Sequence, residues 1–79
     1  MAATLIDPTL HTELIELQRA VFTATERLYA LPREEPAGPL REEVRQAAAA
    51  RDTALHASGL VGEHGYHQAS QALKNTAKS

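Results

Sequence analysis

The sequence predicts an all-α protein, an antiparallel helical hairpin with a short C-terminal helix that dimerises into a four-helix bundle. Apolar residues alternate at spacings of four and three from Leu10 to Leu31, which is the repeat of a packed helix. A segment rich in proline and glycine follows at 32–38, and the alanine tract 47–50 then marks a second helix. Because 79 residues have little core to divide, we expect residues 1–79 to form one small domain.

The first helix is predicted at about residues 8–31. Asp7 is a preferred N-cap, and Pro8 suits the first helical position. Pro32 ends the helix, because the residue before a proline is pushed out of the α-helical region. One face carries a seam of apolar residues in the a and d positions: Leu10, Leu14, Leu17, Val21, Ala24, Leu28 and Leu31.

Residues 32–38 form the predicted linker, and their number suits a connection between antiparallel neighbouring helices. The second helix is predicted at about residues 39–58, with Pro39 in its first turn. It ends at Ser58 and Gly59, where glycine can adopt the left-handed conformation that closes many helices. Its small side chains favour a close approach to the first helix.

The C-terminal segment has a weaker pattern, because two glycines interrupt its start. Tyr66, Ala69 and Leu73 follow a helical spacing, which predicts a short helix at about residues 63–76. We expect residues 77–79 to form a frayed tail.

The first helix carries a second apolar stripe, formed by Ile15, Phe22 and Tyr29 at intervals of seven residues. The second helix can cover only one of the two stripes, so the other needs a different neighbour. A second copy of the chain is the neighbour that we predict, giving a homodimer with these three residues in its interface. The C-terminal segment folding across this stripe is the alternative.

Four histidines are far apart in the sequence but are expected at one end of the hairpin: His11, His56, His64 and His67. Imidazole groups with nearby carboxylates could form a metal site or a proton switch. The alternative is that they are exposed polar residues at helix ends. Their spacing matches no zinc motif, so the sequence predicts no metal and no cofactor.

Arg51 lies at the centre of the apolar face of the second helix. A buried guanidinium needs a carboxylate, and counting residues outward from the linker places Glu16 within reach. We therefore expect a buried Arg51–Glu16 ion pair. Recognition of a carboxylate or phosphate ligand by Arg51 is the alternative.

Composition excludes several classes of protein. There is no cysteine for disulfides, and no apolar run is long enough for a membrane span. Met1 to Asp7 lacks the basic region of a signal peptide, which predicts a cytoplasmic protein, and the alanine and arginine usage is compatible with a high-GC bacterial genome. No serine, histidine and acid stand at a recognisable catalytic spacing, so we do not expect an enzyme.

The sequence thus predicts a small, non-enzymatic helical interaction or regulatory protein that acts through self-association and an unidentified protein partner. A DNA-binding accessory factor is the first alternative, because residues 54–60 look like a helix followed by a glycine turn. The net charge of −2 argues against it, and only Lys74 and Lys78 offer phosphate contacts in the C-terminal segment. A metal- or pH-responsive helical protein is the second alternative.

Overall fold

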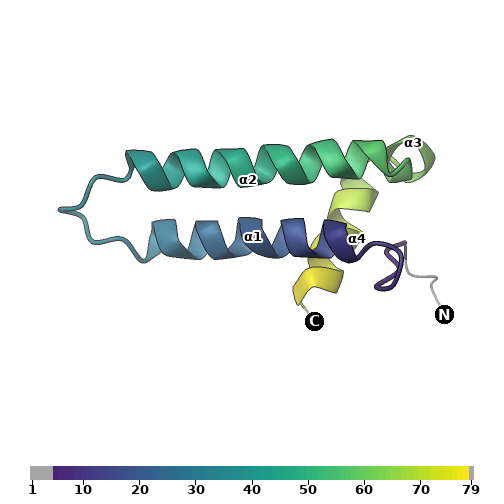
Figure 1. Ribbon diagram of the computed structural model, residues 1–79, viewed down its shortest axis with the longest axis horizontal. Helices are drawn as coiled ribbons and strands as arrows, with labels where there is room; N and C mark the ends of the chain where they lie inside the picture. The colour runs from purple at the N-terminus through teal and green to yellow at the C-terminus, as the bar shows by residue number, and fades with distance from the viewer. Residues whose placement is uncertain (1–4, 79) are drawn as a thin grey trace.

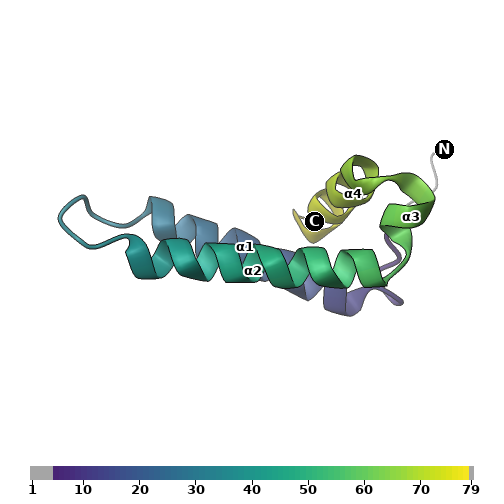
Figure 2. The ribbon, with the colours of Figure 1, turned by 90° about the horizontal axis from the view of Figure 1, so that it is seen from above.

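In the computed structural model, which describes residues 5–78, the chain forms four helices and no strand. Helices α1 (Thr12–Tyr29) and α2 (Gly38–Ala57) lie side by side and antiparallel (Figure 1). The short α3 (Leu60–His64) turns the chain, and α4 (Tyr66–Lys78) then crosses the hairpin at the end away from its loop (Figure 2). Among the described residues, no helix is long and apolar enough to cross a membrane.

Helix α1 is shorter than predicted at both ends. The prediction that Asp7 is the N-cap is wrong, because the N-cap is His11; the Asp7 carboxylate instead accepts the Thr9 N–H at 2.8 Å and closes a separate turn before the helix. The α-helix begins at Thr12, after that turn, and ends at Tyr29. The last α-helical bond joins the Ala30 N–H to the Glu26 carbonyl, whereas the Leu31 N–H bonds to Leu28, so the helix ends two residues earlier than predicted.

The C-terminal helix predicted at residues 63–76 is confirmed over residues 66–76, but its predicted start is wrong. The chain forms two helices there, separated at Gly65, whose φ of 85° and ψ of 152° no other residue type adopts readily. The frayed tail predicted at residues 77–79 is also wrong for residues 77 and 78, which the structure describes. Ala77 is buried and α4 continues to Lys78, while Ser79 lies outside the described residues.

The core lies where α4 crosses the hairpin. Helix α4 contributes Ala69, Leu73 and Ala77, a small-large-small row that packs against Ile15 of α1. The remaining buried members come from the segment before α1, the first turn of α1, the last turn of α2 and the start of α3: Ile6, Leu14, Leu55 and Leu60. Closer to the loop, Ala24 is the one described apolar residue that is buried. The hairpin arms beyond α4 are therefore only two helices thick.

This arrangement makes the molecule long and thin, with extents of 47 × 23 × 20 Å. Its radius of gyration is 14.0 Å, whereas a compact domain of this length has about 12 Å. Its exposed area is 5494 Å², against about 4,700 Å² for a typical monomer of this mass. The hairpin arms thus expose more surface than a compact fold of the same size.

Gly65 provides a test of the break between α3 and α4. A Cβ at Gly65 would touch nothing within 4 Å, so the cost of Gly65→Ala comes from its backbone conformation alone. We expect a loss of about 1 to 3 kcal/mol in the free energy of unfolding, measured by urea denaturation.

Gly62→Ala is the matched control, because Gly62 lies within α3 and its Cβ would also meet open space. This change should be neutral or stabilise the protein by up to about 1 kcal/mol. Equal stability of the Gly65→Ala variant and the unchanged protein would contradict the backbone argument.

Candidate functional site

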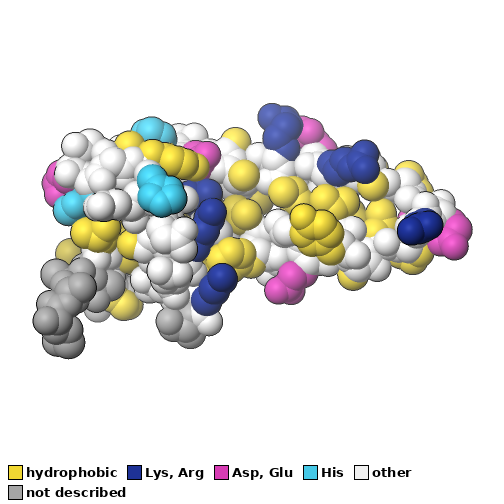
Figure 3. All heavy atoms as spheres, turned by 180° about the vertical axis from the view of Figure 1, so that it is seen from behind, with side chains coloured by type: hydrophobic (Ala, Val, Ile, Leu, Met, Phe, Trp, Pro, Cys, Tyr) yellow, Lys and Arg dark blue, Asp and Glu magenta, His cyan; other side chains and the backbone are white. Residues whose placement is uncertain are grey.

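A groove of about 620 Å³ lies where α1, α2 and α4 meet. Figure 3 shows the face of the molecule that carries α4, where basic side chains adjoin hydrophobic ones along the hairpin. Helix α1 forms one wall with residues at helical spacing, α4 forms the other, and Arg51 of α2 closes the floor. The residues on which the following argument depends are Gln18, Val21, Phe22, Arg51, Lys74 and Lys78.

Gln18 is the most unusual residue of this groove. Its side chain is fully buried, and within the described part of the chain neither its amide nitrogen nor its amide oxygen has a hydrogen-bond partner. Burying such groups unpaired costs about 1–3 kcal/mol. The amide therefore carries one acceptor and two N–H donors that the described residues leave unsatisfied.

Arg51 is 6% exposed and belongs to a polar network that fastens α4 to α2. Its Nη1 donates to the Ser70 hydroxyl at 2.9 Å and lies 3.2 Å from the Asp52 carboxylate. Tyr66 donates its phenol O–H to the same carboxylate at 2.9 Å. The Arg51 Nε, also buried, has no partner among the described residues.

The ion pair predicted between Arg51 and Glu16 is therefore wrong, because Glu16 is exposed and the acid beside Arg51 is Asp52. Counting outward from the linker placed the Arg51 side chain opposite α1. The side chain instead meets α4, whose Ser70 accepts its hydrogen bond.

Two lysines one turn apart on α4 line the groove. Lys74 is half-buried and Lys78 is exposed, and neither forms an ion pair with any described residue. Glu26 lines the opposite wall and is the acid of this groove. The surroundings are therefore positively charged. Lys74 and Lys78, the two basic residues of the C-terminal segment, therefore line the groove and do not form a separate basic face on α4.

The four predicted histidines do not form a metal site, because no three His, Asp or Glu side chains among residues 5–78 lie close enough to share an ion. His11 accepts the Asp7 N–H at 2.9 Å, and the ring of His56 stacks on Tyr66 with centroids 5.9 Å apart. His64 lies 3.6 Å from Glu63, its neighbour in sequence. With the exposed His67, the histidines lie at one end of the hairpin, as expected, but within the described residues they form no shared ion site there (Figure 3).

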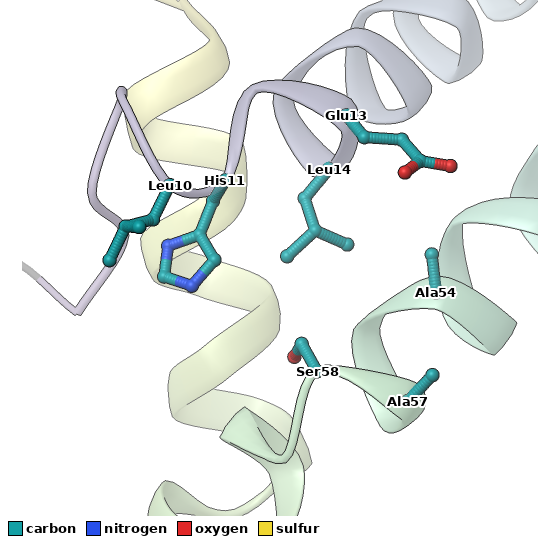
Figure 4. A pocket seen from close by; sticks show the side chains of 7 residues that line it. All are labelled: Leu10, His11, Glu13, Leu14, Ala54, Ala57 and Ser58. Carbon is teal, nitrogen blue, oxygen red and sulfur yellow. The ribbon is translucent and has the colours of Figure 1, made fainter.

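A second hollow, of about 370 Å³, separates the start of α1 from the end of α2 (Figure 4). His11 and Glu13 lie on one wall, but the Glu13 carboxylate points away from His11. The opposite wall consists of Ala54, Ala57 and Ser58. This hollow lacks polar groups that converge on one point, which makes it a weaker candidate than the groove.

The predicted interface stripe is divided by α4. Ile15 is 7% exposed because α4 covers it, and Phe22 is half-buried at the edge of the core. Tyr29 is 83% exposed. The alternative of a C-terminal helix folding across this stripe therefore holds for Ile15 and fails for Tyr29.

Two side chains on the exposed face of α2 have shifted pKa values. The hydrogen bond from Arg45 holds the pKa of Glu42 below its ordinary value, and the same bond raises the pKa of Arg45. Both side chains are exposed on α2, where such pairs contribute little to stability.

Comparison with known proteins adds no relative, since no family model, curated protein or solved structure matches this chain. The functional interpretation therefore depends on the groove and on the part of the stripe that α4 leaves open. Of the groove residues, Gln18 gave the clearest signal in the sequence, because it interrupts the apolar arc of α1 between the two stripes.

Replacing Gln18 tests whether its amide is held at a cost. Gln18→Met keeps the length of the side chain and removes both unpaired groups. We expect the free energy of unfolding to rise by about 1–3 kcal/mol in urea denaturation, with an unchanged dependence on urea.

Gln68→Met is the control, because Gln68 is exposed on α4. It should change stability by less than about 0.5 kcal/mol. A destabilised Gln18→Met variant would show that the amide is paired in solution.

Proposed function

We propose that this chain is a non-enzymatic helical interaction protein that pairs with a second copy of itself through the uncovered stripe, formed by Phe22 and Tyr29. The exposure of Tyr29, at 83%, is the observation that carries the proposal. Figure 3 shows hydrophobic side chains continuing along the hairpin beyond α4. Soluble monomers seldom leave such a row in contact with water.

The exposed area supports pairing with a second copy. The chain exposes 5494 Å², about 800 Å² more than a typical monomer of its mass. A standard protein interface covers about 800 Å² on each partner. The excess area of the chain is therefore similar in size to the area that one partner covers in a standard interface.

The shape of the hairpin favours a two-fold arrangement. Beyond α4 the arms are two helices thick, and a second hairpin laid across them supplies two more. The result is a four-helix bundle in which each α4 covers one end. Two-fold dimers are the commonest closed assemblies, because one surface then serves both partners. A pair of this kind would act as an adaptor or regulator by presenting two identical ends to a further protein.

Tyr29→Asp tests this pairing without disturbing the core, from which Tyr29 is absent. We expect the unchanged protein to have about twice the chain mass by light scattering at low micromolar concentration. The variant should have the mass of one chain and keep its helical circular dichroism, because the new charge would be buried only in the dimer. Phe22→Asp is less informative, since Phe22 also packs against the core.

Leu10→Asp is the matched control, because Leu10 is 78% exposed but lies at the opposite end of α1. This variant should remain a dimer. An unchanged protein that is monomeric in this concentration range would overturn the proposal, as would a Tyr29→Asp variant that stays dimeric.

A further inference from the structure

We infer that the groove between α1, α2 and α4 receives the loop (residues 30–37) of a second copy of this chain. In this arrangement Glu34 and Glu35 of each copy lie against Lys74 and Lys78 of the other. The inference rests on the pairing proposed above, and it adds the register of the two hairpins and the charged contacts between them.

The groove lies on the side of α4 that faces the loop. Ile15 packs against α4, and the α1 residues that line the groove come later in the helix, as far as Glu26, so they lie nearer the loop. Figure 2 shows α4 on one side of the hairpin, which it leaves bare from there to the loop. A second hairpin laid along this bare side therefore ends against the flank of α4 that forms the groove.

The spacing of the open stripe selects one register for a two-fold pair of α1 helices. Placing Phe22 against Phe22 would put the second Tyr29 opposite Ile15, which α4 already covers. Placing Tyr29 against Tyr29 would leave Phe22 opposite the loop. Phe22 against Tyr29 is the register that pairs both residues of the stripe in both copies. Residues 33–36 of the second copy then lie level with residues 15–18, where α4 crosses.

The loop is long enough to reach α4 in this register. The rise of α1 from Ile15 to Phe22 is about 10 Å, at about 1.5 Å per residue. The loop runs out and back between Tyr29 and Gly38, so about four residues in each direction can extend up to about 13 Å. The tip of the loop in one copy can therefore contact α4 of the other.

The charges at this contact are opposite. Lys74 and Lys78 line the groove, and Glu34 and Glu35 are exposed on the loop. None of these four side chains forms an ion pair with another residue between 5 and 78. Helix α4 crosses the hairpin at the end away from the loop (Figure 1), so the lysines and these acids can meet only between copies.

Two further charges and one hollow complete the contact. Arg33 of the loop and Glu26 of the groove each reduce the charge of their own side without reversing it. Glu35 and Tyr29 border the same hollow at the loop end, with a volume of about 450 Å³. This acid therefore lies beside the end of the open stripe, and one partner can cover both.

Two charge-reversed variants test the contact. Glu34→Lys/Glu35→Lys and Lys74→Glu/Lys78→Glu each place like charges against each other at both contacts of a homodimer. By sedimentation equilibrium at low salt, we expect each variant alone to have a dimer dissociation constant at least about tenfold higher than the unchanged protein. An equimolar mixture should regain the original affinity, because both contacts of the mixed pair then join opposite charges.

Glu13→Lys/Glu63→Lys is the matched control, since it changes the net charge as much as the first variant does, at exposed residues near the other end of the hairpin. It should leave the dissociation constant unchanged. Equal weakening by this control, or a mixture no tighter than its components, would overturn the loop contact while the pairing through Phe22 and Tyr29 stands. A monomeric unchanged protein would overturn the pairing and the contact together.

Carbodiimide cross-linking of the unchanged protein is a second measurement, and it needs no variant. The reagent joins a carboxylate to a lysine amine that touches it. In a mixture of unlabelled and ¹⁵N-labelled chains, mass spectrometry should find mixed-isotope links between Glu34 or Glu35 and Lys74 or Lys78. Mixed-isotope links that involve other acids alone would overturn the register.

Discussion

The packing of α4 against Ile15 is the contact on which the rest of this structure depends. Leu73 is fully buried between Ala69 and Ala77, and these three residues supply the α4 side of the core. Without α4, the hairpin would keep only the contacts between α1 and the alanine-rich α2. The direction in which α4 crosses is set at Gly65, where the backbone leaves the helical conformation and enters one that other residues avoid.

This packing also fixes the polar groups. Helix α4 covers Arg51 and provides Ser70 as its partner, so the guanidinium stays inside the protein with its charge opposed by Asp52. The same crossing buries Gln18 without giving its amide a partner within residues 5–78. The packing of α4 thus stabilises the fold by burying apolar side chains. At Gln18 the same packing costs part of that stability, because it buries the amide unpaired.

The sequence was sufficient for the hairpin and insufficient for the path of α4. The seam of apolar a and d residues ends at Pro32, and a helix followed by a turn is the structure that this pattern predicts. Helix α2 matches its predicted range to within one residue at each end. The C-terminal segment has few large apolar residues, so its pattern could not show that α4 packs on α1. The Arg51–Glu16 pair failed for the same reason, since counting along a hairpin considers two helices and the third supplied the partner. The interrupted apolar arc at Gln18 was visible in the sequence, but only α4 shows that it is buried.

The groove and the uncovered stripe meet at Phe22, which lines the groove and also begins the stripe that continues to Tyr29. Phe22 also packs against the core, so the groove, the open stripe and the packing of α4 are all affected by a change at this one residue.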